Sequence, residues 1–243
     1  IMYRFYVSAD QLAEKEVFIS GGDVNHIKNV LRLEVGDWIV ACDGNGTDYV
    51  SRIQSICSDE VVASIEKVQP TGTELPVRIT LFQGMPKKDK LELIIQKAVE
   101  LGAARIVPVQ TALSEEKKIN KRLERWQSIA YAAAKQCDRG IIPTVHKPVS
   151  YEEALAMADQ LDYNVIPYEL QTGMEEARKI VDQACKQRSL GIFIGPEGGF
   201  EPEEVERAMT RNIHPMTLGK RILRTETAGM ALLSILMFQM QGE

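Results

Sequence analysis

The chain has 243 residues, of which 44% are hydrophobic and 26% are charged, and its formal net charge at pH 7 is -5. This composition is typical of an ordinary globular protein, and it argues against a largely disordered chain or a membrane helix. The acidic balance also argues against recognition of nucleic acid by overall charge, so any RNA-binding surface has to be a local patch.

The first 70 residues predict a small β-rich domain. Short alternating segments at residues 38–41, 49–57 and 61–68 are expected as strands, with turn residues after the first of them. A short helix is expected over residues 23–31, where apolar residues recur at helical spacing. Prolines and a glycine at residues 69–76 predict a linker. The expected domains are therefore residues 1–70 and 74–243.

The pattern changes after Pro76, where apolar strands alternate with amphipathic helices. Strands are expected at residues 78–83, 105–109, 164–167, 190–195 and 216–218. Helices are expected at residues 89–101, 120–136, 151–158, 174–186, 202–212 and 227–240. This alternation predicts an α/β fold with a mostly parallel sheet that is covered by helices on both faces.

One candidate ligand loop is the glycine-rich turn after an apolar strand, in the sequence IFIGPEGGF at residues 192–200. Ligands bind at the carboxyl ends of strands in open α/β sheets, and glycines let the backbone approach them closely. Glu201, Glu203 and Glu204 would repel a pyrophosphate at the next helix start, and the spacing fits no phosphate-binding motif. The turn favours a ligand with an adenine and a cationic centre, although a plain strand-to-helix turn explains it equally well.

A second candidate loop has the sequence LGKRILRTETA at residues 218–228. Ile222 and Leu223 lie between two arginines, and Thr225 or Thr227 is expected to cap the helix that follows. Apolar loop residues need something to cover, and an adenine would serve; alternatively they fill the core while the arginines face water. A third loop starts at Tyr168 and is expected at the same sheet edge, because it also follows a strand.

The cysteines and histidines indicate no metal site. Cys42, Cys57, Cys137 and Cys185 form no CxxC pair, and the three histidines are far apart in the sequence. This distribution predicts neither a zinc site nor a disulfide framework. Free cysteines are typical of a reducing compartment, and the N-terminus has no signal pattern, so we expect a cytoplasmic protein without a membrane segment.

Several segments, in this order, resemble those of the RsmE family, the 16S ribosomal RNA uridine-N3 methyltransferases of the SPOUT class. They are MYRFYV at residues 2–7, HIKNVLRLEVGD at 26–37, KKDKLELIIQKAVELGAARIVPVQT at 87–111, AAAKQCDR at 132–139, and the two loops IGPEGGF and LGKRILRTETA. One departure is that residues 132–134 lack the acidic residue often found before the position of Gln136 in the family.

The resemblance implies a PUA-like RNA-binding barrel at residues 1–70 and a SPOUT methyltransferase domain at residues 74–243. That domain would carry a C-terminal trefoil knot, an exception to the rule that chains are unknotted. The three loops would be the knot loops and would bind S-adenosylmethionine. Two subunits would pair as a homodimer, and the substrate would be 16S ribosomal RNA, within the small ribosomal subunit.

The chemistry of N3 methylation selects two candidate catalytic residues. Uracil N3 carries a proton and lies on the Watson–Crick edge, so the base has to be unpaired and the proton removed. Arg224 is expected to stabilise the uracil anion, and Glu197 is the candidate general base. Two alternatives stay open: a salt bridge of Arg224 with Glu197 or Glu226, and a loop-bracing role for Glu197.

Ten residues form the predicted cofactor set: Tyr168, Gly195, Pro196, Gly198, Gly199, Leu218, Gly219, Ile222, Leu223 and Thr227. Arg4, Arg32 and Arg139 are candidates for contact with RNA phosphate, or else ordinary surface charges. Two other functions stay open, a ribosome-assembly factor that only binds RNA and a 2'-O-ribose methyltransferase of the same fold. The sequence identifies neither the target nucleotide, nor whether the substrate is naked RNA or a subunit, nor the RNA-contacting surface.

Overall fold

The computed structural model describes residues 2–87, 90–110 and 120–241, with the side chains of residues 120 and 121 left out. The chain divides into two compact units. The first contains Ile1–Glu74 and Ala134–Ile142, and the second contains Leu75–Ala133 and Pro143–Glu243. Within the described residues, every helix is too short or too polar to span a membrane.

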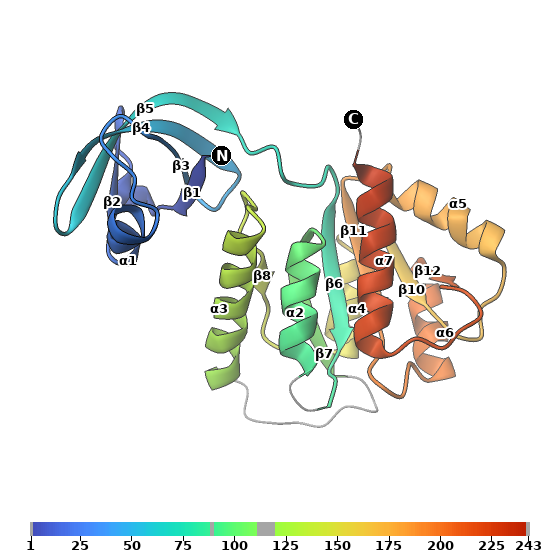
Figure 1. Ribbon diagram of the computed structural model, residues 1–243. Helices are drawn as coiled ribbons and strands as arrows, with labels where there is room; N and C mark the ends of the chain where they lie inside the picture. Colours follow the sequence, from blue (N-terminus) through green and yellow to red (C-terminus); the bar gives the residue numbers. More distant parts are fainter. Residues whose placement is uncertain (1, 88–89, 111–119, 242–243) are drawn as a thin grey trace. The chain divides into compact units, whose positions relative to one another are not determined.

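The first unit is a curled five-stranded sheet (Figure 1). Its strands are β1 (Tyr3–Tyr6), β2 (Glu16–Ser20), β3 (Trp38–Cys42), β4 (Thr47–Ile56) and β5 (Glu60–Pro70), in the order β1-β3-β4-β5-β2. β1 pairs with β3 in parallel and the other pairs are antiparallel. Alternate side chains, such as Phe5, Ile19 and Ile53, point into the concave face and form the core. The three predicted strands are confirmed, whereas β1 and β2 were not predicted.

The predicted helix at residues 23–31 is not a regular α-helix. A four-residue helix α1 (Gly22–Asn25) continues into a π-helical turn η2 (His26–Val30), in which the Leu31 N–H donates to the His26 carbonyl at 2.9 Å. Val24 and Ile27 are buried in the core, so the predicted short helix is confirmed, and the structure adds that its second half is π-helical. Arg32 follows with a φ of 53°, a left-handed conformation that few arginines adopt. A short 3₁₀ turn, η1 (Ala9–Gln11), lies earlier in the chain.

The second unit is built on a seven-stranded sheet in which every pairing is parallel. Its strands are β6 (Arg78–Gly84), β7 (Ala103–Gln110), β8 (Thr144–Val145), β9 (Val149–Ser150), β10 (Tyr163–Pro167), β11 (Ser189–Ile194) and β12 (Ile213–Met216). The order is β12-β10-β11-β6-β7-β8, with β9 also paired to β7. The last strand was predicted at residues 216–218 and instead ends at Met216.

Helices cover both faces of this sheet (Figure 1). They are α2 (Lys90–Glu100), α3 (Asn120–Gln136), α4 (Tyr151–Ala158), α5 (Met174–Ala184), α6 (Pro202–Thr210) and α7 (Thr225–Met240). α4 and α6 share a core with Phe82 and Phe193, whose rings stack at 4.4 Å. On the opposite face α7 packs against α2, and its Gly229 lies beside Ile194. The predicted α/β fold with a parallel sheet is confirmed.

Candidate functional site

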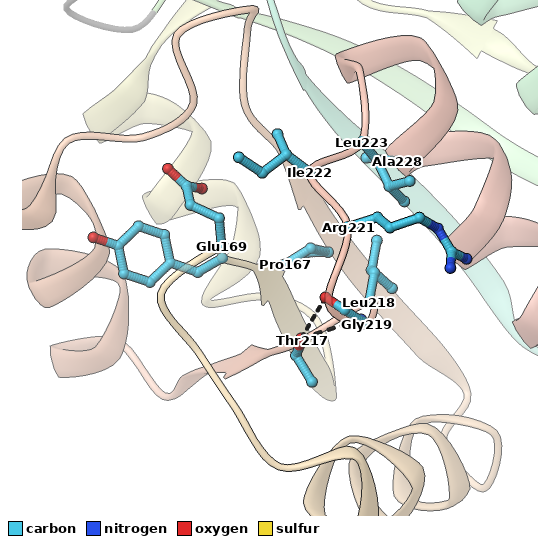
Figure 2. Close-up of a pocket in the computed structure, with 10 residues that line it drawn as sticks. Pro167, Glu169, Thr217, Leu218, Gly219, Arg221, Ile222, Leu223 and Ala228 are labelled. Atoms are coloured by element: carbon cyan, nitrogen blue, oxygen red, sulfur yellow. Dashed lines mark hydrogen bonds between the residues drawn. The ribbon is translucent and has the colours of Figure 1, made fainter.

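Three loops meet at one edge of the parallel sheet. They follow β10, β11 and β12, which are neighbours in the sheet and end at Pro167, Ile194 and Met216. Two hollows lie between these loops, and both are lined by Pro167, Glu169, Ile222, Leu223 and Ala228 (Figure 2). Because the hollows share these walls, they are adjacent, and we refer to the two together as the cleft.

Nine of the ten predicted cofactor residues line this cleft. Tyr168, Leu218 and Gly219 line one hollow, Gly195, Pro196, Gly198 and Gly199 line the other, and Ile222 and Leu223 line both. Thr227 is the exception: it is exposed on the first turn of α7, and Thr225 lines the cleft in its place. From the sequence, Thr225 was predicted only as a helix cap, whereas Arg224 is the N-cap of α7.

The glycine turn after β11 folds back on itself so tightly that side chains are excluded. A Cβ on Gly195 would lie 2.9 Å from the carbonyl carbon of Gly199. Gly199 has a φ of +76°, and a Cβ there would lie 3.3 Å from Oε1 of Glu169 on the neighbouring loop. Only glycine fits both positions without a shift of the backbone. At its glycines the turn therefore presents bare backbone to the cleft.

The third loop provides an apolar wall. Ile222 is 89% exposed although it borders both hollows, so the alternative that it fills the core is wrong. Figure 2 shows Ile222 and the Glu169 carboxylate on facing loops of the cleft. An exposed isoleucine opposite a carboxylate, beside bare backbone, is suited to a ligand with a flat apolar part and a polar or cationic part.

A buried hydroxyl connects two of the loops. Thr225 is 5% exposed, and its Oγ1 donates a hydrogen bond to the Gly195 carbonyl oxygen at 2.5 Å. The same hydroxyl accepts a hydrogen bond from Nε2 of Gln83, at the end of β6, at 2.8 Å. Sequence reasoning missed both roles. The only available signal was a hydroxyl residue at the start of a helix, which Thr227 shares.

Glu197 is held by cationic and backbone donors. Its two carboxylate oxygens each accept from the Lys87 N–H at 3.1 Å, and Lys90 Nζ lies 3.3 Å from Oε1. Burial acts to raise the pKa of Glu197, but its own N–H, the Lys87 N–H and the Lys90 ammonium outweigh burial and lower that pKa. A carboxylate held in its charged form is a weaker base, so the geometry supports the loop-bracing alternative.

Arg224 is exposed and lies directly before α7. Neither of the ion pairs that the sequence left open, with Glu197 or Glu226, is present. Instead, Lys90 forms ion pairs with both carboxylates: its Nζ lies 3.3 Å from Oε1 of Glu197 and 3.4 Å from Oε2 of Glu226. Within the described parts of the chain, no hydrogen bond or ion pair is found for the Arg224 guanidinium, which is therefore available to a substrate.

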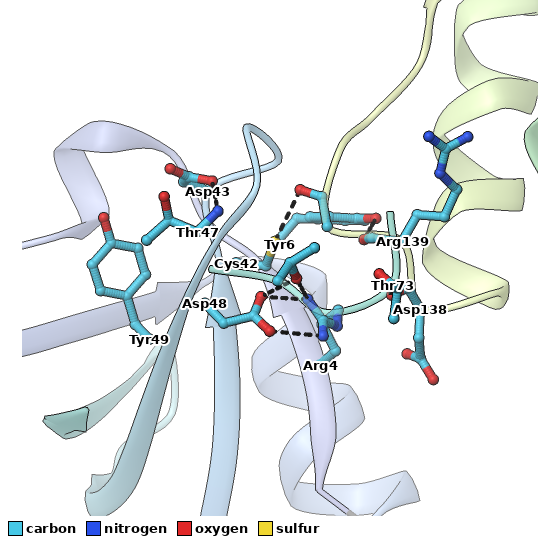
Figure 3. A network of polar contacts seen from close by, with 12 residues as sticks. Arg4, Tyr6, Cys42, Asp43, Thr47, Asp48, Tyr49, Thr73, Asp138 and Arg139 are labelled. Atoms are coloured by element: carbon cyan, nitrogen blue, oxygen red, sulfur yellow. Dashed lines mark hydrogen bonds and ion pairs between the residues drawn. The ribbon is translucent and has the colours of Figure 1, made fainter. Parts of the chain in front are cut away.

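Two of the three arginines expected to contact RNA phosphate are in ion pairs within the first unit, and Figure 3 shows the pair of Arg4 with Asp48. Arg4 Nη2 donates to Asp48 at 2.9 Å, and Nη1 also reaches Thr71 at 3.0 Å. Arg139 has a side chain only 5% exposed and pairs with Glu74. Arg4 and Arg139 therefore have structural partners and are not free positive charges. Arg32 is exposed, as a phosphate contact requires.

Substitution of Arg139 should therefore destabilise the protein. Glu74 also accepts the Gly140 and Ile141 N–H groups, at 3.0 and 3.2 Å, so its partly buried carboxylate would stay in place without its cationic partner. We expect Arg139→Ala to lower the free energy of unfolding by about 3 kcal/mol. Urea unfolding of the full chain measures this, with the exposed Arg188→Ala as control. A loss for Arg139→Ala no larger than that of the control would contradict the structural role.

The fold and the cleft define an α/β protein with a candidate ligand site at the carboxyl edge of its sheet. Family comparisons agree with this class. Residues 73–237 match the family described as "RNA methyltransferase domain", and residues 19–66 match "RNA methyltransferase PUA domain". The chain is thus in the class of RNA methyltransferases.

Individual relatives identify one family within the class of RNA methyltransferases. The chain is 38% identical to ribosomal RNA small subunit methyltransferase E of Bacillus subtilis, over 98% of this chain and 97% of the relative. It is 31% identical to the protein of the same name from Mesomycoplasma hyopneumoniae, over 96% and 98% of the two chains. A crystal structure of the Neisseria gonorrhoeae protein of that name, bound to S-adenosyl methionine, superposes with a TM-score of 0.80 at 32% identity, covering 98% of each chain. The chain belongs to the ribosomal RNA small subunit methyltransferase E family.

Proposed function

We propose that this chain transfers the methyl group of S-adenosylmethionine to N3 of a uridine in 16S ribosomal RNA. The observation that carries the proposal is the three-loop cleft, with its bare glycine backbone, its exposed apolar wall and the exposed Arg224 beside it. Family membership supports the same activity.

The residues of the cleft fit S-adenosylmethionine. Ile222, Leu223 and Pro167 offer apolar surface for the adenine. Gly195 and Gly199 have no side chains to cover the backbone, so a ligand can contact its polar groups. Glu169 offers a carboxylate to the cationic half of the cofactor. When bound, this cofactor supplies a methyl group already activated on a sulfonium, so the protein has no need to activate the donor. The remaining tasks of the chain are to orient the reactants and to manage the N3 proton.

Arg224 is the proposed catalytic residue. A guanidinium is always charged and donates in a planar fork, so it can stabilise the negative charge that develops on the uracil when N3 loses its proton. The contacts of Glu197 with Lys87 and Lys90 favour its charged form, so Glu197 is a poor acceptor for that proton. We therefore assign Glu197 to holding the glycine turn and propose solvent water as the acceptor of the N3 proton.

Finer features of the family extend the proposal. The three loops would form a trefoil knot, residues 1–70 would act as the RNA-binding domain, and residues 74–243 as the catalytic domain. A homodimer is supported by two apolar side chains on α7, Ile235 and Phe238, which are 46% and 80% exposed. The substrate would be the RNA within the small ribosomal subunit, in the cytoplasm.

Methyl transfer from labelled S-adenosylmethionine to small ribosomal subunits tests the activity. The expected product is N3-methyluridine in a nuclease digest, identified by mass spectrometry. A digest in which the methyl group instead blocks the adjacent cleavage would indicate a 2'-O-ribose methyltransferase. Tight RNA binding without any transfer would indicate an assembly factor.

Arg32 is the proposed phosphate contact of the first unit. Its φ of 53° is unfavourable for arginine, and strain of this kind is often retained at functional positions. Arg32→Gly should lower the affinity for 16S ribosomal RNA and reduce the salt dependence of binding by about one charge. It should not lower thermal stability, because glycine adopts positive φ freely. Fluorescence anisotropy across a salt series measures this.

The exposed Lys15→Ala is the control for loss of one charge in the same unit. Equal RNA affinity of the wild type and Arg32→Gly would contradict the assignment of Arg32. A clear loss of thermal stability in Arg32→Gly would show that this conformation is held by contacts rather than strained.

A further inference from the structure

A buried hydrogen-bonded chain connects β6 to both sides of the cleft. Gln83 is fully buried at the end of β6, and its Nε2 donates to Thr225 Oγ1, which donates in turn to the Gly195 carbonyl oxygen. Gly195 opens the glycine turn, and Thr225 directly follows Arg224. The hydrogen bonds that link Gln83, Thr225 and Gly195 thus join the cofactor cleft to the residue proposed for catalysis.

The direction of each hydrogen bond in this series, from donor to acceptor, is fixed. Thr225 has one hydroxyl proton and gives it to Gly195, so it can only accept from Gln83. Nε2 of Gln83 also donates to the Gly84 carbonyl oxygen at 3.0 Å, which excludes the flipped amide. Gln83 Oε1 is then buried without a hydrogen-bond partner in the described structure. Such an acceptor is destabilising, which indicates that this amide orientation serves a purpose beyond stability.

The same end of β6 also contacts the turn through its backbone. A Cβ on Gly84 would lie 2.6 Å from the backbone nitrogen of Pro196, so only glycine lets the turn come this close. Gln83 and Gly84 together therefore fix the Gly195–Pro196 peptide from one side of the sheet. Gln83 does not line the cleft, so it can influence a ligand only through the residues it holds.

We propose that Gln83 and Thr225 are positioning residues that set the shape of the cofactor cleft and the placement of Arg224 at the same time. The inference rests on the proposed function. Because one hydroxyl holds both the glycine turn and the start of α7, its loss should loosen both. Cofactor affinity and methyl transfer at saturating cofactor should therefore fall together.

Isothermal titration with S-adenosylhomocysteine and single-turnover methyl transfer test this proposal. Thr225→Val removes the hydroxyl at nearly constant volume, and we expect it to raise the dissociation constant about tenfold, the effect of losing one buried hydrogen bond. Methyl transfer at saturating S-adenosylmethionine should fall by a further factor of about ten. Thr225→Ser, which keeps the hydroxyl, should restore both.

Gln83→Leu should act through the same chain, so the double variant with Thr225→Val should be no worse than the more affected single variant. Hydrogen exchange of the unliganded protein should be faster at residues 195–201 and 224–228 in both single variants. Thr80→Val is the matched control, because Thr80 on β6 is also 5% exposed and lies away from the cleft. It should leave binding and exchange unchanged.

Wild-type binding and transfer in Thr225→Val, or equal losses in Thr80→Val, would overturn the positioning role. Strictly additive effects of the two substitutions would also overturn it. If Thr225→Val does not fold, hydrogen exchange of Gln83→Leu at residues 195–201 and 224–228 decides whether the positioning role holds. Absence of S-adenosylhomocysteine binding by the wild type would instead contradict the proposed function itself.

Discussion

Gly195→Ala is expected to weaken the binding of S-adenosylhomocysteine strongly. The new methyl group would lie 2.9 Å from the carbonyl carbon of Gly199 and 3.0 Å from its Cα, so the glycine turn has to open. Both contacts are with backbone atoms, which cannot rotate away as a flexible side chain would. We expect the dissociation constant to rise by a factor of about 100 or more, equivalent to about 3 kcal/mol. Isothermal titration measures the affinity directly.

The matched control is Gly72→Ala, where a Cβ would meet no atom within 4 Å and the backbone needs no positive φ. It should bind as the wild type does. Circular dichroism of both variants separates a damaged cleft from an unfolded chain. Unchanged affinity in a folded Gly195→Ala protein would mean that the ligand does not depend on the shape of this turn.

Arg224→Ala is expected to slow methyl transfer by a factor of about 100 to 1000, as when a donor to a developing anion is removed. Its affinity for S-adenosylhomocysteine should stay within about twofold of the wild type, because Arg224 does not line the cleft. Single-turnover transfer to small ribosomal subunits at saturating S-adenosylmethionine isolates this effect. Higher pH should partly restore the rate, since the uracil anion would then form without the guanidinium.

Lys220→Ala removes a charge from the same loop and is the control, since Lys220 is exposed and outside the cleft lining. Arg224→Lys should recover part of the rate by keeping the charge without the planar fork. If Arg224→Ala instead weakened cofactor binding and left the rate at saturation unchanged, Arg224 would be a binding residue.

The regular elements of this chain were predictable because each carries its own local signal. α2 repeats apolar residues at helical spacing, α7 is a long and mostly apolar segment, and β6 and β11 are short segments rich in apolar residues. β8 and β9 have two residues each, which is too short for any period. β12 contains His214 and Pro215, so its sequence lacks the pattern of a strand, and its pairing with β10 defines it instead.

The candidate site was predictable where unusual residues stand together. Glycines after a strand and apolar residues in a basic loop are conspicuous without any structure. Partners distant in the sequence were not predictable: Asp48 is 44 positions from Arg4, and Glu74 is 65 positions from Arg139. A lone arginine therefore looked like a surface charge. The choice between Thr225 and Thr227 likewise depends on which side of α7 faces Gly195, and spacing alone leaves that open.

The first unit is discontinuous, and this has a consequence for its synthesis. Ala134–Ile142 belongs to the N-terminal unit, and it supplies Arg139 to Glu74 and the Gly140 carbonyl oxygen to the Gly46 N–H at 3.0 Å. A growing chain makes Leu75–Ala133, part of the other unit, before this segment exists. The N-terminal sheet must therefore wait on the ribosome in an incomplete form, with the Glu74 carboxylate lacking its arginine, until residue 142 has left the exit tunnel.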